Sequence, residues 1–287
     1  MYFIFVIMPI LSVLKITMQG KYSQKNVKTF SDVLIFNTIS FLFSTIILAI
    51  IFLREIPPVE VWIYALISGF VFVFYQVFYT FAFKKGPISA TAIIVSFYIV
   101  FVLLSGLIFY NETWTAFTIV GLCFMFIAFY LIPSKSNDKK ANLIWLIFTI
   151  LTFIFAGLSG SILFLFSKST FSSWKTEYIT LFFVFATLLS SLFTLFNVKV
   201  RKDPITIKRS RELPIVSSII GLALGIYYVL YVVIYQYYPS YIVSPIISGT
   251  TIALTMVVNS IINKEKPTLK MLIGVIFAVI AIVLLNL

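Results

Sequence analysis

The chain has 287 residues, of which 61% are apolar and 10% are charged, and its mean hydropathy is +1.11. An average soluble domain is about half apolar and about a quarter charged, so this composition excludes a soluble globular protein and indicates an integral membrane protein. The single cysteine, Cys123, excludes an intramolecular disulfide and a cysteine metal cluster.

Charges, prolines and polar clusters separate ten apolar spans. In chain order they lie at residues 2–20, 31–53, 60–83, 87–109, 114–133, 142–167, 177–197, 214–237, 240–262 and 269–286. Each has about 20 residues, enough at about 1.5 Å of rise per residue to cross a hydrocarbon core of about 30 Å. Since the spans are apolar on every side, they do not fit the alternating strands of a membrane barrel. The sequence predicts an all-α integral membrane protein with ten transmembrane helices.

The first span and the connection between the third and fourth spans both fit this interpretation. The first span lacks the basic start and the small-residue cleavage site of a signal peptide, so we expect it to be retained as the first helix. Further along, Lys84 and Lys85 close the span at 60–83. Gly86 then makes a turn, and Pro87 opens the next span at a position where its missing N–H costs nothing. A tight hairpin at the membrane surface is predicted there.

Residues of the first half of the chain recur 153 positions later in the second half; Glu112, for example, corresponds to Glu265. The segments FYNETWTAFTIVGLCFMFIA and IINKEKPTLKMLIGVIFAVIA are related in this way, and the offset also pairs Lys15 with Lys168, Tyr75 with Tyr228, Gly121 with Gly274 and Ala128 with Ala281. The chain is therefore predicted to contain two five-helix repeats, at residues 1–134 and 142–287. Because five is odd, the second repeat enters the membrane from the opposite side. Such inverted repeats are typical of transporters that bind substrate near the bilayer midplane.

The segment ISATAIIVSFYIVFVLLSGLIFYNETWTAFTIVGLCFMFIAFYLI resembles the EamA-type repeat of the drug/metabolite transporter superfamily. In that repeat an apolar fourth helix runs into a Gly-Glu turn, followed by a fifth helix that contains glycine. The turns here read Asn-Glu and Lys-Glu, with Glu112 and Glu265 in the acidic position, and Asn37 stands where an arginine often opens the second helix. The resemblance covers nearly the whole chain. It implies a ten-helix carrier of small metabolites, often an exporter.

Polar and aromatic side chains inside the spans are the candidates for a substrate cavity. Tyrosines repeat on one helical face in the spans at 60–83 and 214–237, and the span at 240–262 combines Pro245 and Gly249 with hydroxylated residues. Interfacial anchoring of tyrosines and close helix packing by small residues are the alternative explanations. The candidate residues are Ser12, Tyr75, Gln76, Tyr79, Thr91, Ser96, Tyr228, Tyr231, Ser244, Ser248 and Thr251.

Ionisable side chains are scarce within the spans. All nine carboxylates fall in loops or at span ends, and the chain has no histidine. We therefore expect no buried ionisable group that serves as a proton relay, and neither a metal nor a cofactor. The GLSG segment at Gly157–Gly160 matches a motif of intramembrane serine proteases, but their serine needs a histidine base. An enzyme is not predicted.

The expected function is that of a carrier that moves a small organic metabolite, amino-acid-like or similarly polar, across the plasma membrane by alternating access at a central cavity. The expected partners are that solute and membrane lipids, not nucleic acid. A flippase for lipid-linked or amphiphilic molecules and a channel are the alternatives; no charge ring or filter motif favours a channel. The spans at 114–133 and 269–286 carry almost no internal polar groups, so we expect them at the periphery or in a homodimer contact.

Lysine and arginine concentrate on one side of the predicted membrane topology. The connections after the odd-numbered spans hold 17 of the 21 such residues, including the basic run at 199–212, which we interpret as a membrane-surface loop. The positive-inside rule puts these loops in the cytoplasm and both termini outside, whereas the family resemblance usually implies cytoplasmic termini. We follow the charges, because short loops are where the rule applies.

A cysteine introduced between residues 199 and 212 tests this orientation. Because this loop is predicted to be cytoplasmic, a membrane-impermeant thiol reagent should label the cysteine only after the cells are permeabilised. Labelling of intact cells would show that the orientation is reversed.

Overall fold

The apolar runs of the sequence form helices in the computed structural model, which describes residues 2–52, 55–112, 114–131, 142–207, 211–263 and 269–284. All regular elements in these ranges are helical, as predicted. They are α1 (Ile4–Asn26), α2 (Phe30–Phe52), α3 (Val59–Lys85), α4 (Ile88–Ser96), α5 (Ile99–Tyr110), α6 (Ala116–Leu131), α7 (Leu143–Lys168), the short 3-10 helix η1 (Ser172–Trp174), α8 (Lys175–Lys199), α9 (Glu212–Tyr237), α10 (Ser240–Asn263) and α11 (Leu269–Leu284).

Seven helical segments in the described ranges are long and apolar enough to cross a membrane. They are Ile4–Asn26, Phe30–Ile51, Val59–Lys85, Ala90–Tyr110, Leu143–Lys168, Ser172–Lys199 and Glu212–Tyr237. Shorter apolar stretches lie in α6 and α10, and α11 has 16 residues. The chain is therefore a multi-pass membrane protein, while the count of ten crossings stays a prediction.

The single helix predicted over 87–109 is divided in two. α4 ends at Ser96 and α5 begins at Ile99, and the two residues between them form a turn. There the backbone amides of Phe97 and Tyr98 donate to carbonyls three residues earlier, at 3.2 and 2.9 Å. Such i→i+3 bonds tighten the coil relative to an α-helix. The Ser96 hydroxyl also donates to the Ala92 carbonyl at 2.7 Å, a contact that often bends helices.

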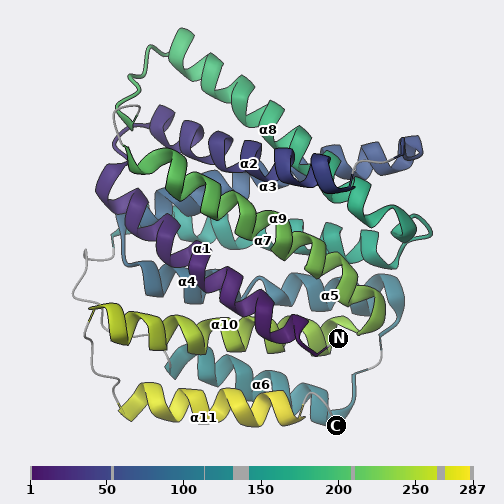
Figure 1. Cartoon of the computed structure of the whole chain (residues 1–287). Coiled ribbons are helices and arrows are strands. Elements are labelled where there is room, and N and C mark those ends of the chain that lie inside the picture. Colours follow the sequence, from purple (N-terminus) through teal and green to yellow (C-terminus); the bar gives the residue numbers. More distant parts are fainter. Residues whose placement is uncertain are drawn as a thin grey trace.

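Some helices pack together in the core of the bundle, and others lie at its edge (Figure 1). α3 packs on α7 and α8, and α2 packs on α8 and α9. α6 and α11 lie against each other at the lower edge of the view in Figure 1, at the periphery where their apolar sequences led us to expect them. The start of α1 and the end of α11 lie on the same side of the bundle.

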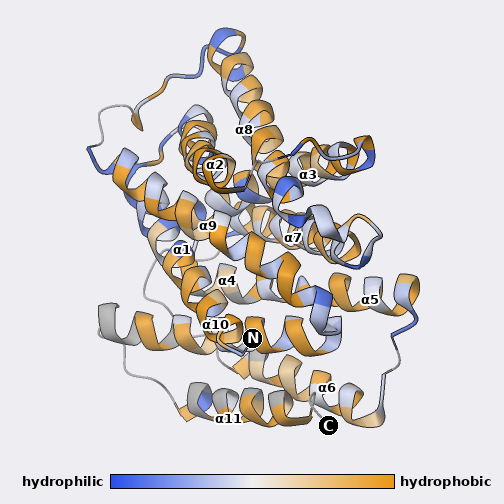
Figure 2. Ribbon diagram, turned by 45° about the vertical axis from the view of Figure 1, so that its right-hand side comes forward, coloured by the Kyte–Doolittle hydropathy of each residue, from blue (hydrophilic) through white to orange (hydrophobic). Residues whose placement is uncertain are grey.

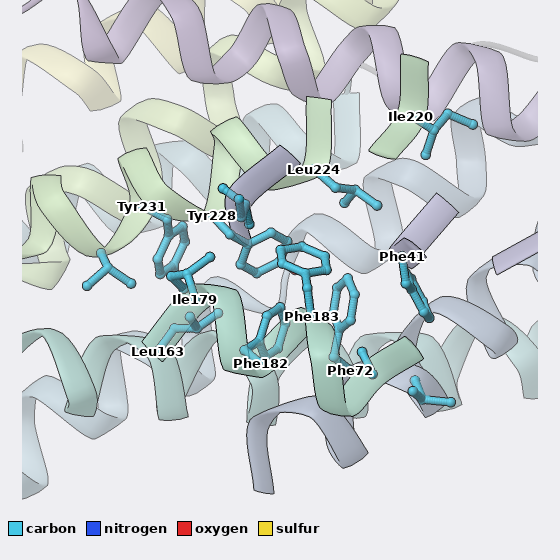
Figure 3. Packing of buried hydrophobic residues seen from close by; sticks show 14 of the residues in the cluster. Phe41, Phe72, Leu163, Ile179, Phe182, Phe183, Ile220, Leu224, Tyr228 and Tyr231 are labelled. Carbon is cyan, nitrogen blue, oxygen red and sulfur yellow. The ribbon is translucent and has the colours of Figure 1, made fainter. Parts of the chain in front are cut away.

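The aromatic core lies between α2, α3, α8 and α9 (Figure 3). The ring of Phe72 contacts those of Phe182, Tyr228 and Phe183, with centroid distances of 4.8, 5.1 and 5.7 Å. Hydrophobic residues run along the helices throughout the bundle (Figure 2), and many of them are exposed, such as Ile50 with an exposed fraction of 80%. A surface this apolar suits contact with lipid tails.

Carboxylates join the first half of the chain to the second at each end of the bundle. At what we call the Asp32 end, the Asp32 carboxylate accepts hydrogen bonds from the amides of Thr206 and Ile207 at 2.8 and 3.0 Å. At the Glu112 end, the Glu112 carboxylate accepts hydrogen bonds from the amide and the hydroxyl of Ser240, at 3.0 and 2.5 Å. The α8–α9 loop and the start of α10 are thereby each held to the first half.

The offset of 153 residues holds for only part of each repeat. α3 begins at Val59 and α9 at Glu212, and α6 and α11 start and end with the same separation. α1 and α7, however, begin only 139 residues apart, at Ile4 and Leu143, because the second half has more residues before α9. The predicted pairing of Lys15 with Lys168 is therefore wrong: Lys15 lies in the middle of α1, whereas Lys168 ends α7. Glu265, the predicted partner of Glu112, lies outside the described residues.

Two glycines of α9 provide a matched test of how closely α2 and α9 approach. A Cβ atom at Gly221 would lie 2.5 Å from the Ser40 carbonyl oxygen, whereas one at Gly225 would lie 3.5 Å from Leu48. Gly221→Ala should therefore destabilise the protein by about 1–3 kcal/mol through overpacking. Gly225→Ala should be neutral or stabilising, because alanine favours a helix over glycine by up to about 1 kcal/mol. Thermal unfolding of the purified variants in detergent checks both; equal melting temperatures would contradict the packing.

Candidate functional site

A cavity lies between α1, α3, α4, α7, α9 and α10. It contains about 80 Å³ of space that the centre of a water-sized sphere can reach. Three of the surrounding helices come from each half of the chain, and no described residue of α6 or α11 lines the cavity. Five of the six helices, all except α7, carry residues that the sequence analysis named as candidates for the cavity.

Tyrosine rings form most of the aromatic wall. Six of them line the cavity: Tyr75 and Tyr79 of α3, Tyr98 of the turn between α4 and α5, and Tyr227, Tyr228 and Tyr231 of α9. The rings of Tyr75 and Tyr79 stack at 5.6 Å, and those of Tyr227 and Tyr231 lie 6.0 Å apart. This wall offers a solute flat apolar faces together with phenolic hydroxyls.

Helical spacing explains why these residues face the same space. Leu224, Tyr227, Tyr228 and Tyr231 of α9 follow the i, i+3, i+4, i+7 pattern of a single helix face. On α7 the corresponding face is small, with Ala156 and Gly160. The neighbouring helices can therefore approach the α9 tyrosines closely; the Tyr231 hydroxyl lies 3.2 Å from the place that a Cβ atom at Gly160 would occupy.

Lys15 is an ionisable group buried within α1, a span in which we expected no such group to serve as a proton relay. It lines the cavity and is only 8% exposed. Its ammonium group donates a hydrogen bond of 3.4 Å to the Tyr75 hydroxyl. It also lies 5.1 Å from the ring centroid of Tyr75 and 5.0 Å from that of Tyr79, within range of cation–π attraction.

The hydroxyl groups that line the cavity differ in whether they have a hydrogen-bond partner. Ser12, Ser96, Ser248 and Thr251 line it. The Ser96 hydroxyl donates within its own helix, whereas the Thr251 hydroxyl is buried without a hydrogen-bond partner among the described residues. An unpartnered buried hydroxyl carries a desolvation cost that a bound solute or water can relieve.

Eight of the eleven predicted candidates meet at this cavity: Ser12, Tyr75, Tyr79, Ser96, Tyr228, Tyr231, Ser248 and Thr251. The other three lie in packing contacts outside its lining. Gln76 accepts a hydrogen bond of 3.3 Å from Gln19, Thr91 accepts one of 2.7 Å from the Trp145 indole, and Ser244 bonds to the Tyr235 hydroxyl.

Lys15, Tyr98 and Tyr227 line the cavity but were not among the predicted residues. A lone lysine far inside an apolar span is by itself a signal of function, and it was available in the sequence. Tyr227 lies beside the predicted face of Tyr228 and Tyr231, and the rotation of α9 in the bundle brings it to the cavity. Tyr98 faces the cavity from the turn between α4 and α5, which the sequence did not predict.

Comparison with known proteins identifies the architecture. The family model of the EamA-like transporter family matches residues 3–133 and 147–287, one match in each half. No curated protein matches the chain significantly. One solved crystal structure, whose title names no function, aligns over 98% of this chain and 98% of its own, with a TM-score of 0.68 and 12% identity. That likeness shows a shared fold alone.

Thr91 gives a test of which candidates are structural. Thr91→Val removes the acceptor of the buried Trp145 indole N–H, and an unpaired buried donor costs about 1–3 kcal/mol. Thr149→Val is the matched control, because the hydroxyl of this buried threonine donates only to the Trp145 carbonyl of its own helix. The melting temperature in detergent should fall for Thr91→Val and change little for Thr149→Val. Equal melting temperatures would contradict the structural role of Thr91.

Proposed function

Because the chain belongs to the EamA-like transporter family, we propose that it carries a small organic metabolite across the plasma membrane by alternating access at the tyrosine-lined cavity. The solute is amino-acid-like or similarly polar, and the direction is export. The observation that carries this proposal is the position of the cavity, which is enclosed by three helices from each of the two family-matched halves.

The depth of the cavity supports the proposal. Leu11, which lines the cavity, is the middle residue of the apolar span at 2–20, with nine residues on either side. At the α-helical rise this places the site about 14 Å from each end of the span, near the middle of a bilayer. A solute held there is far from both aqueous phases, so transport requires the protein to open to each side in turn.

The inter-repeat contacts at the two ends are suited to this alternation. The Asp32 carboxylate binds the α8–α9 loop, and Lys25 forms an ion pair of 2.6 Å with Glu212 at the same end. The Glu112 carboxylate holds Ser240 at the opposite end. Each contact joins the first repeat to the second, so separation of the repeats at either end must break its contacts. We propose that the two repeats have inverted topology, cross the membrane ten times in all and rock about the cavity.

Two alternatives are separable by the species that moves. A flippase would move only amphiphiles between leaflets, and a channel would pass an ion current that does not exchange. A carrier shows saturable flux, with faster uptake of labelled solute when unlabelled solute is present on the opposite side. An untargeted comparison of the medium of cells lacking and overexpressing the protein supplies the solute for this measurement.

Variants of the cavity wall test the site in proteoliposomes. Tyr75→Ala and Tyr228→Ala remove rings on opposite repeats and should each lower exchange of the identified solute about tenfold, since the contacts of one ring contribute about 1.4 kcal/mol. Ser248→Ala should also lower exchange. Tyr130→Ala on α6 is the control, because Tyr130 is 72% exposed and faces away from the cavity. Normal exchange by correctly inserted Tyr75 and Tyr228 variants would overturn the assignment of the cavity as the transport site.

A further inference from the structure

Lys15 is an ionisable group buried inside the bundle, on the wall of the cavity. It lies five residues before the end of the apolar span at 2–20, in the middle of α1, and it is only 8% exposed. A charge at this depth is costly in a membrane protein, and it is found where it serves a pathway or a ligand. The position of Lys15 on the cavity wall therefore calls for a partner of opposite charge.

The described residues do not supply that partner. Among them, Lys25 and Glu212 form an ion pair, whereas no carboxylate lies within 4.0 Å of the Lys15 ammonium group. This group has three N–H donors, and its hydrogen bond in the described structure is the one of 3.4 Å to the Tyr75 hydroxyl. The rings of Tyr75 and Tyr79 stabilise the positive charge through their faces but do not neutralise it.

The surroundings of Lys15 match a particular ligand chemistry. Ser12, one helical turn away on α1, lines the same space, as do the Tyr231 hydroxyl and the Thr251 hydroxyl, the latter without a hydrogen-bond partner among the described residues. An anion can accept hydrogen bonds from an ammonium group and from hydroxyls together, while the tyrosine rings pack on a flat apolar body. A cationic solute would instead be repelled by Lys15 at low dielectric.

We propose that the solute of this cavity is an organic carboxylate with a flat apolar body, whose carboxylate pairs with Lys15 and whose body packs against the tyrosine rings. The inference rests on the proposed carrier function for its meaning in transport. Binding at the site, however, is measurable on the purified protein without any flux.

The test uses three probes that share one body and differ in charge: 3-phenylpropionate, 3-phenylpropanamide and 3-phenylpropylamine. Titration calorimetry on the full chain in detergent gives their dissociation constants. The carboxylate should bind about tenfold more tightly than the amide, because a hydrogen bond to a charged group is stronger than a neutral one, and the amine should bind most weakly. A series of aryl carboxylates and their amides, from benzoate to 2-naphthoate, repeats the comparison with apolar parts of different size, in case 3-phenylpropionate does not fit the cavity.

Variants then assign the preference to Lys15. In Lys15→Met and Lys15→Gln the ratio between carboxylate and amide should fall to about one, and Lys15→Arg should keep a preference for the carboxylate. The control is Lys21→Met, which removes the same charge from an exposed position of the same helix and should leave the ratio unchanged. Since Lys15→Met removes an unpaired buried charge, its melting temperature without ligand should equal or exceed that of the parent.

The inference is overturned if no carboxylate in the series binds more tightly than its amide, or if the preference survives in Lys15→Met and Lys15→Gln. Flux measurements separate this from the proposed function. Saturable exchange of only neutral or cationic solutes in proteoliposomes would overturn the inference and leave the carrier. Carboxylate-selective binding that depends on Lys15, without flux of any bound solute, would support the inference and contradict the carrier.

Discussion

The bilayer offers no hydrogen-bond partners, and the structure depends on how each buried polar group meets that constraint. Many hydroxyls in the helices are satisfied locally. Those of Ser40, Thr149 and Thr180 each donate to the carbonyl four residues earlier, at 2.8 or 2.9 Å. Because such bonds stay inside one helix, neighbouring helices can pack through apolar and small side chains without having to satisfy polar partners.

At the cavity, some polar groups have no hydrogen-bond partner within their own helix. The Thr251 hydroxyl has no hydrogen-bond partner and Lys15 has no ion pair among the described residues. One turn further along α1, the Gln19 side-chain amide donates across helices, to the Thr80 hydroxyl at 3.0 Å and to the Gln76 side-chain oxygen at 3.3 Å. Open polar capacity at the cavity, within walls of aromatic rings, is the physical basis for assigning solute binding there.

The two repeats contribute to this place unequally. Tyr75 and Tyr228 occupy equivalent positions at the 153-residue offset, and both line the cavity. Lys15 has no charged counterpart on the cavity face of α7, which consists of Ala156, Gly160 and Leu163. The site is therefore nearly symmetric in its aromatic wall and asymmetric in its charge, so a charged solute has one preferred end in the cavity.

Hydropathy and residue spacing are properties of the chain that packing does not alter. They were therefore enough to predict the membrane class, the helical spans and the repeat, and to reveal the family resemblance. Periodicity also found Tyr75 and Tyr228. Only the tertiary structure decided which side of each helix meets the cavity, since a helix face gains its role from the neighbour packed against it. The rotation of α9 places Tyr227 at the cavity, and the hydrogen bond with Trp145 makes Thr91 a packing residue. The position of Tyr98 at the turn and the burial of Lys15 depend on helices that are far apart in the chain.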